Sequence, residues 1–268
     1  HLEPRHLLGL TATPERADGL DVLRWFGGRI AIELRLWDAL EQGLLYPFHY
    51  FGIHDGTDLS KVTWRRGTGY DVGELANVYT ADDLWAGKVV ETVQDKIGDP
   101  HRMRALGFCV SIGHATFMAD RFSRAGLEAR AVTSETPAAE RHQSLAELRE
   151  GRVQVLFTVD LFNEGVDVPT IDVVLMLRPT ESATVFLQQL GRGLRRTRDK
   201  DVLTVLDFVG HQRKEFRFDR RYRGMLGRTR RELERDVETG FPYLPAGCLF
   251  DLDHVAREIV LDSIRHAL

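Results

Sequence analysis

The sequence predicts an α/β fold in which helices flank a parallel sheet. Between residues 105 and 208, short apolar runs alternate with segments whose apolar residues have helical spacing. The apolar runs are continuous, as strands are when helices cover both faces of their sheet. With 268 residues, of which 43% are hydrophobic, the chain can bury the core of one large domain or of two smaller ones.

The individual elements follow from the same patterns and from residues that start or stop helices. Pro14 ends the first apolar run, because proline cannot continue a hydrogen-bonded ladder. Thr80 followed by Asp83 predicts a helix start, and Gly98 with Pro100 predicts the end of that helix. We expect strands at 7–10, 29–34, 46–53, 105–112, 129–133, 153–159, 171–177 and 202–208, a turn at 54–58 and a loop at 240–247. We expect helices at 18–26, 36–45, 80–97, 113–126, 137–151, 182–190, 213–235 and 251–268.

The composition excludes several classes of protein. No apolar run approaches the ~18 residues of a membrane span, and the first residues lack the pattern of a signal peptide. We therefore expect no membrane partner. The two cysteines, Cys109 and Cys248, exclude a disulfide scaffold and predict a reducing cytoplasm. The net charge of -4 means that any surface for nucleic acid has to be local.

The segment from Gln188 to Arg196 carries the strongest chemical signal. Its two glycines allow the backbone to approach a partner closely. Arg192 and Arg195 are three residues apart, so on a helical turn they would face the same way. Two guanidinium groups presented together suit a polyphosphate, because each offers a planar fork of donors. The alternative is a solvated basic helix end that complements the helix dipole.

Three further segments follow predicted strands. Residues 158–169 begin at the carboxyl end of a strand, where ligands bind in open α/β sheets; the alternative is a connecting loop. Residues 10–14 also follow a strand and are weak evidence alone. In residues 108–115, Ser111 and His114 lie at a predicted helix N-terminus, which attracts anions. For His114 the alternative is a helix cap.

Together, these four segments resemble the conserved motifs of a superfamily 2 helicase or translocase. They match in order: motif III (Thr11–Thr13), motif IV (Phe108–His114), motif V (Thr158–Asp167) and motif VI of the form Gln-x-x-Gly-Arg-x-x-Arg (Gln188–Arg195). Residues 37–43 and 177–182 look like bacterial DEAD/DEAH-type DNA helicases that carry a further C-terminal domain of unknown function. The resemblance covers residues 1–210 and is weaker beyond them.

The resemblance implies RecA-like domains of the P-loop NTPase type, with ATP bound between two of them. The chain would then hold the end of the first domain (1–43), the whole second domain (44–210) and a basic helical extension (211–268). The sequence contains neither the phosphate loop nor an Asp-Glu box: Gly87-Lys88 lacks the upstream glycine. Because the chain starts at His1, we expect it to be a piece of a larger protein. Without the phosphate loop and the acidic box, we expect this piece to be inactive alone. The missing N-terminal RecA-like domain would supply the Mg²⁺ ligands.

The same resemblance implies roles for individual residues. Arg192 and Arg195 would be arginine fingers that point at the γ-phosphate of ATP. The other implied roles are nucleotide binding (Gly165, Asp167, Gln188), contact with the nucleic-acid backbone (Ser111, His114, Thr158) and coupling of hydrolysis to domain closure (Thr11, Thr13). The implied partners are ATP with Mg²⁺ and single-stranded or duplex DNA, with RNA as the alternative.

Two alternatives concern the tail and the function as a whole. Residues 213–231 combine arginines with Phe216, Phe218 and Tyr222, a pattern typical of nucleic-acid binding, but interspersed acidic residues also fit a salt-bridged helix. A non-catalytic nucleic-acid- or protein-interaction module could keep the RecA-like fold without turnover. An unrelated nucleotide-binding α/β enzyme would require the motif VI match to be accidental.

Overall fold

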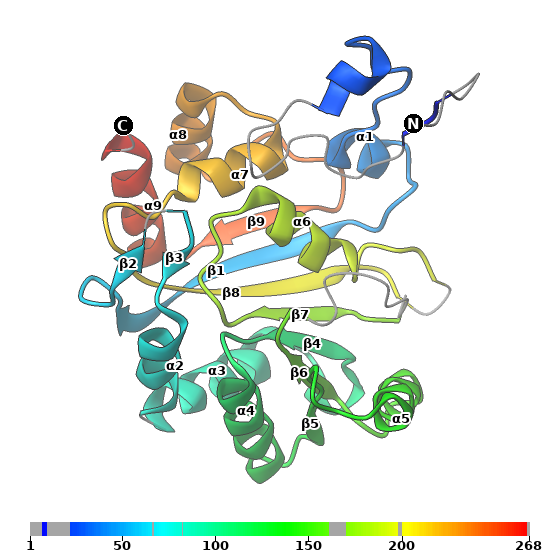
Figure 1. Cartoon of the computed structure of the whole chain (residues 1–268), viewed down its shortest axis with the longest axis vertical. Coiled ribbons are helices and arrows are strands. Elements are labelled where there is room, and N and C mark those ends of the chain that lie inside the picture. The colour runs from blue at the N-terminus through cyan, green and yellow to red at the C-terminus, as the bar shows by residue number, and fades with distance from the viewer. Residues whose placement is uncertain are drawn as a thin grey trace.

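A seven-stranded parallel sheet forms the centre of the molecule. The computed structural model describes residues 7–9, 22–65, 67–81, 83–160, 170–197 and 200–266. The strand order is β5-β6-β4-β7-β8-β1-β9, and every neighbouring pair is parallel (Figure 1). The strands are β1 (Phe48–Asp58), β4 (Ala105–Phe108), β5 (Ala129–Ala131), β6 (Val155–Thr158), β7 (Val173–Met176), β8 (Leu203–His211) and β9 (Leu249–Leu252). A separate antiparallel hairpin joins β2 (Trp64–Arg65) to β3 (Gly69–Tyr70).

Helices cover both faces of this sheet. They are α1 (Leu36–Glu41), α2 (Val72–Thr80), α3 (Asp83–Lys96), α4 (Ile112–Arg124), α5 (Ala138–Arg149), α6 (Ala183–Gly191), α7 (Phe218–Leu226), α8 (Arg230–Thr239) and α9 (His254–His266), with 3-10 turns at Val22–Phe26 and Pro100–Arg102. On one face, α3 packs Trp85 against Phe208 of β8. On the other, α6 and α7 pack against Tyr50 of β1. Because side chains alternate along a strand, these contacts belong to opposite faces.

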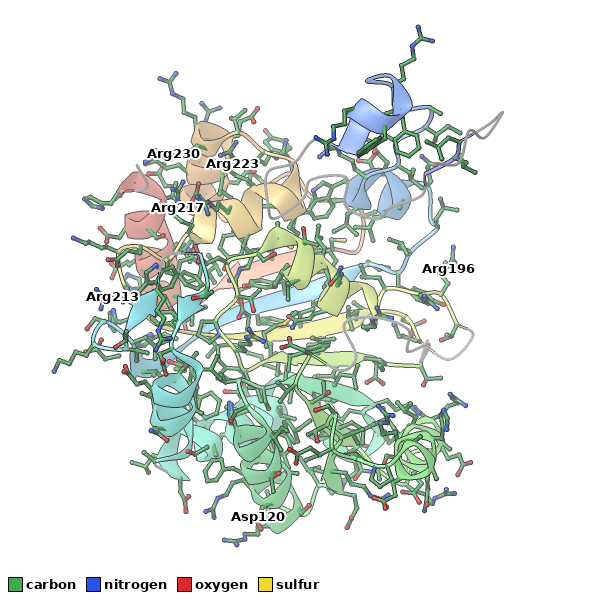
Figure 2. All side chains as sticks on the ribbon, viewed as in Figure 1. Asp120, Arg196, Arg213, Arg217, Arg223 and Arg230 are labelled. Carbon is green, nitrogen blue, oxygen red and sulfur yellow. The ribbon has the colours of Figure 1, made fainter. Side chains whose placement is uncertain are left out.

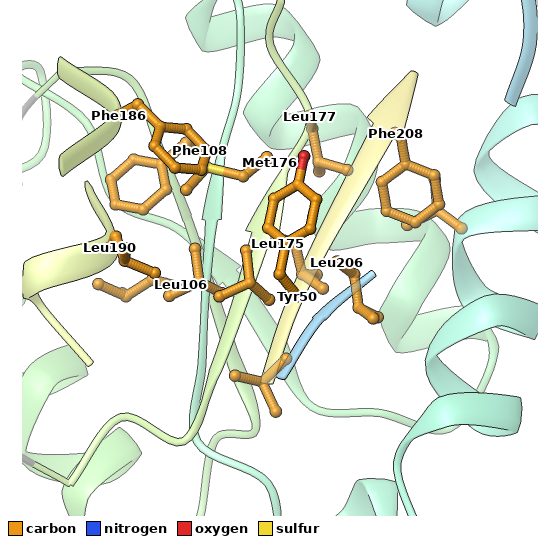
Figure 3. Close-up of a cluster of buried hydrophobic side chains, with 14 of the residues drawn as sticks. Tyr50, Leu106, Phe108, Leu175, Met176, Leu177, Phe186, Leu190, Leu206 and Phe208 are labelled. Atoms are coloured by element: carbon orange, nitrogen blue, oxygen red, sulfur yellow. The ribbon is translucent and has the colours of Figure 1, made fainter. Parts of the chain in front are cut away.

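The buried core fills the space between the sheet and these helices (Figure 3). Leu106, Leu175 and Leu206 come from the neighbouring strands β4, β7 and β8, and none of them has exposed surface. Phe186 and Leu190 of α6 complete the cluster on the side of Tyr50. The continuous apolar runs of the sequence are therefore strands covered on both faces, and the predicted α/β fold with a RecA-like parallel sheet is confirmed.

Local sequence explains where several helices start and stop. Ser111 caps α4 and Asp71 caps α2, each with a side-chain oxygen that accepts a backbone N–H of the first turn. Thr229 and Glu232 form a reciprocal capping box at the start of α8. Gly227 ends α7 in the left-handed conformation that glycine adopts at little cost, so the single helix expected over 213–235 is two helices.

Other expected elements differ from the structure. β1 continues through the predicted turn at 54–58, because its pairing with β8 extends to His211. Thr80 ends α2 instead of starting a helix, and its hydroxyl donates to the carbonyl of Ala76 (2.9 Å). Residues 29–34, expected as a strand, are exposed and form none. At 54–58, pairing with β8 overrides the turn that the residues predict. At Thr80, the short helix α2, which the residue pattern had not revealed, makes this residue a helix end.

The region after residue 210 contains a strand that sequence reasoning missed. β9 pairs in parallel with β1, from His49 opposite Leu249 to Gly52 opposite Leu252. β9 has only four residues, with alternating exposed and buried side chains, and it follows a loop rich in proline and glycine. The expected helical extension is therefore tied to the sheet, while the domain boundary at 210 stays a prediction.

A buried ion pair fastens α7 to the sheet. The guanidinium of Arg221 lies 2.6 Å from the carboxylate of Asp207 in β8, and both residues are 2% exposed. Tyr50 donates to the same carboxylate, and Arg221 donates to the hydroxyl of Tyr222 (2.8 Å). Burial opposes the charge of Arg221, but Asp207 raises the pKa of the guanidinium above its ordinary value. The cation therefore stays paired inside the core.

Candidate nucleotide and nucleic-acid site

The arginine-bearing segment lies at the edge of the sheet where the central strands begin. The helix α6 follows β7 and runs back along the sheet, so its C-terminal end returns to the start of β8. The backbone N–H of Tyr46, just before β1, donates to the carbonyl of Leu194 (2.9 Å). The N–H of Leu203 in β8 donates to the carbonyl of Pro47 (3.0 Å). Figure 1 shows α1 at this same end of the sheet.

Close packing at this edge depends on one of the two glycines. A Cβ atom on Gly193 would lie 2.3 Å from a methyl carbon of Leu203, which has no exposed surface. A Cβ atom on Gly191 would meet nothing within 4 Å. The close backbone approach that the sequence predicts therefore occurs at Gly193, and the surface it approaches is the sheet of this same chain.

The arginines occupy different environments. Arg192 is half-buried and keeps helical dihedral angles as the residue that ends α6. Arg195 is exposed and lies beyond the helix, so helical spacing does not place the two guanidinium groups on a common face. Gln188 lies in the last turns of α6 and is half-buried. The neighbouring Gln189 is the buried glutamine of the pair, at 2% exposed.

A second group of predicted residues lies at the opposite edge, where the strands end. β4, β6 and β7 stop in register, with Phe108 opposite Thr158 on one side and Met176 on the other. Just beyond, Arg178 donates to both carboxylate oxygens of Asp160 (2.9 and 3.0 Å). The predicted site residues are therefore divided between two edges of one sheet.

Ser111 and His114 lie at this second edge with different exposure. Ser111 is half-buried and accepts the backbone N–H of His114 (3.1 Å), which is the expected helix start. The ring of His114 has no exposed surface and stacks on Tyr79, with centroids 5.2 Å apart. Burial lowers the pKa of His114 to about 3, so the ring is neutral, and its Nδ1 accepts the N–H of Val110.

The burial of these side chains limits what can reach a ligand. In this arrangement the imidazole of His114 packs in the core, so a nucleic-acid contact from this ring requires its aromatic cover to move. The side chain of Thr158 is also fully buried. Both side chains are thus buried in this arrangement, and their expected contact with a nucleic acid stays a prediction. Ser111 and the backbone at the start of α4 remain accessible at this edge.

Comparisons with known proteins relate this sequence to helicases. The sequence matches the family model of the Helicase conserved C-terminal domain over residues 88–197. A 51.5 kDa protein of Lactococcus phage (isolate 7-9) is 30% identical over 200 residues, covering 74% of this chain and 42% of the phage protein. The putative ATP-dependent helicase IRC3 of Saccharomyces cerevisiae is 27% identical over 204 residues, covering 76% of this chain and 29% of IRC3.

The fold is also found among solved structures. The ATP-dependent Type ISP restriction-modification enzyme LlaBIII bound to DNA superposes with a TM-score of 0.57 at 15% identity, over 96% of this chain and 20% of that one. Over residues 88–197, this chain carries a helicase C-terminal domain of the superfamily 2 type. It spans less than half the length of either curated relative, and the more specific resemblance to bacterial DNA helicases stays a prediction.

Four of the predicted site residues lie outside the described residues. They are Thr11 and Thr13 of motif III, and Gly165 and Asp167 of motif V. Their assignment to coupling and to nucleotide binding therefore stays a prediction. Within the described ranges, no three His, Cys, Asp or Glu side chains gather into a metal site. The same ranges hold no helix with both the length and the apolar character to cross a membrane.

The basic tail, residues 213–231, is largely engaged in internal contacts. Its aromatic residues Phe216, Phe218 and Tyr222 are buried, so in this arrangement they cannot stack on bases. Besides the buried pair of Arg221 with Asp207, its arginines meet carboxylates in ion pairs such as Arg213 with Glu215 (3.2 Å), Arg217 with Asp219 (2.7 Å) and Arg228 with Asp236 (3.1 Å). Figure 2 shows Arg213 and Arg217 far from Arg196. The structure thus favours the salt-bridged alternative.

Two residues near the arginines escaped the sequence reasoning. Lys200 is 7% exposed, and its ammonium donates to the carbonyls of Ile171 (2.7 Å) and Gly193. Tyr46 donates through its hydroxyl to the carbonyl of Thr197. In the sequence, Lys200 is one charge in a charged stretch and Tyr46 one aromatic among several. No local sequence pattern marks either residue, because the carbonyls to which they donate come within reach only when the chain is folded.

Proposed function

We propose that this chain is the C-terminal motor domain of an ATP-dependent superfamily 2 DNA helicase or translocase. In this proposal Arg192 and Arg195 act as arginine fingers, with Gln188, Gly165 and Asp167 on the nucleotide side. Ser111 and the adjacent strand ends contact the nucleic-acid backbone, and Thr11 and Thr13 couple hydrolysis to domain closure. ATP is the substrate implied by the family, and Mg²⁺ would be held by the first domain.

One observation carries the proposal: the loop that bears the arginines is fastened to the edge of the sheet. Gly193 packs against Leu203, and the carbonyls on either side of Arg195 receive donors from Tyr46. A fixed backbone supports a guanidinium that must meet charge developing on a phosphate, because catalysis of phosphoryl transfer depends on positioning and electrostatics. An ordinary solvated helix end would not require such fastening.

DNA is the nucleic acid we favour, since the solved LlaBIII structure of the same fold is described as bound to DNA. Contacts to phosphate and sugar carry no sequence information, so we expect binding without sequence preference and with strong dependence on salt. RNA is the competing outcome. We also propose a cytoplasmic location, as the low cysteine content of the sequence predicts.

The test is ATP turnover with and without single-stranded DNA. It uses the complete protein in which these residues occur, beside the purified 268-residue chain. We expect DNA-stimulated turnover in the complete protein, a loss of roughly 10³–10⁵-fold in Arg192→Ala, and none in the 268-residue chain alone. Exposed Arg65→Ala is the control. Turnover of Arg192→Ala equal to wild type would refute the finger, and no turnover in the complete protein would favour the non-catalytic interaction module.

A further inference from the structure

The carbonyls of the arginine-bearing loop are held from two sides. Lys200 donates to the carbonyl of Gly193, and the backbone N–H of Tyr46 donates to the carbonyl of Leu194 (2.9 Å). The hydroxyl of Tyr46 donates to the carbonyl of Thr197. Three carbonyls within five residues therefore accept hydrogen bonds, two from the side chains of Lys200 and Tyr46 and one from a backbone N–H. We call residues 193–197 the arginine loop, because Arg195 lies within it and Arg192 directly precedes it.

Lys200 makes contacts that an apolar residue of similar length could not. Its ammonium also reaches the carbonyl of Ile171 (2.7 Å), just before β7, and lies 5.6 Å from the ring centroid of Tyr46. Burial lowers the pKa of Lys200 to about 8, although the nearby carboxylate of Asp172 opposes the shift. Burying a cation against carbonyls is unfavourable compared with packing a methyl group there. The geometry therefore indicates a role in placing backbone.

Tyr46 links the same loop to the segment that precedes the sheet. It lies between α1 and β1, and the guanidinium of Arg196 lies 5.4 Å from its ring centroid. Arg196 also donates to the carbonyl of Gly43. Residues 43–46 and the arginine loop are therefore joined in both directions, so a displacement of one segment is passed to the other.

We propose that Lys200 and Tyr46 are positioning residues that hold the arginine loop and so determine where Arg192 and Arg195 are presented. This inference rests on the proposed arginine-finger function and deepens it. Neither residue touches the nucleotide in the proposal: both act through carbonyls of the loop. Tyr46 also gives the segment before the sheet a route by which its movement changes the placement of the arginines.

The experiment uses Lys200→Met, which keeps length and removes the cation, and Tyr46→Phe, which removes only the hydroxyl. The matched controls are Lys61→Met and Tyr243→Phe, whose side chains are exposed and lie outside the loop. The first measurement is amide hydrogen exchange over residues 190–197 in the 268-residue chain. We expect exchange at least about tenfold faster in Lys200→Met, a smaller increase in Tyr46→Phe, and no change in the controls.

The second measurement is DNA-stimulated ATP turnover by the complete protein. We expect kcat to fall about 10- to 100-fold in Lys200→Met with KM for ATP within twofold, because misplaced arginines weaken transition-state contacts more than substrate binding. Tyr46→Phe should lower kcat less, and it carries the test if Lys200→Met does not fold. Wild-type exchange and wild-type kcat in Tyr46→Phe and any folded Lys200→Met would overturn the proposal. If Arg192→Ala keeps full turnover, the finger function fails, while the exchange data still decide whether the loop is held.

Discussion

Removing the buried cation of Arg221 should destabilise the whole fold. The substitution Arg221→Met keeps much of the side-chain volume but leaves the carboxylate of Asp207 in the core without its cation. Both groups are 2% exposed, so water cannot replace the lost partner, and within the described part of the chain only the hydroxyl of Tyr50 still donates to the carboxylate. Breaking a buried pair in this way costs about 3–5 kcal/mol in the free energy of unfolding.

The assay is urea unfolding followed by far-UV circular dichroism and by tryptophan fluorescence. Arg223→Met is the matched control: it lies on the same helix, its side chain is 47% exposed, and its nearest carboxylate contact is 4.0 Å. Its loss should cost at most about 1 kcal/mol, because Arg223 is half-exposed and the buried carboxylate of Asp219 keeps Arg217 at 2.7 Å. A second variant that also replaces Asp207 with Leu should recover most of the lost stability, because no charge is then left buried. Equal unfolding midpoints for Arg221→Met and Arg223→Met would refute the reasoning.

Two further variants test other parts of the structure. The pKa of His114 is lowered to about 3, so below pH ~6.5 the unfolded chain binds a proton that the folded chain does not. The free energy of unfolding should therefore be highest above that pH and fall by about 2 kcal/mol by pH 5. His114→Gln should flatten this dependence relative to wild type, the exposed His254→Gln should not, and equal slopes in all three proteins would contradict the assignment. Gly193→Ala should lower stability by about 1–3 kcal/mol, because its Cβ would meet the buried Leu203, whereas Gly191→Ala should be neutral or stabilising in the same thermal melts. A Gly193→Ala protein as stable as Gly191→Ala would show that the packing can relax.

The sequence was sufficient to predict the sheet and most helices between residues 105 and 208. Continuous apolar strands separated by helical spacing leave few arrangements other than a parallel sheet covered on both faces. Motif order was likewise enough to predict the helicase resemblance, since residue types and spacing are properties of the chain itself. The prediction of a helix start at Ser111 needed only the local pattern, because a capping serine acts within its own first turn.

Only the tertiary structure decided which polar residues face outward and which lie in the core. Arg221 and Arg223 are two residues apart on α7, yet one is buried against Asp207 and the other is solvated. His114 lies at a helix N-terminus, where anions bind, but Tyr79 from a helix more than 30 residues earlier covers its ring. Lys200 and Tyr46 are unremarkable in sequence and converge on one loop through the sheet. The strand β9 pairs with an edge that β1, a segment distant in the sequence, offers it. Periodicity and motifs are local properties that one chain displays directly, whereas burial and pairing depend on which distant segments meet.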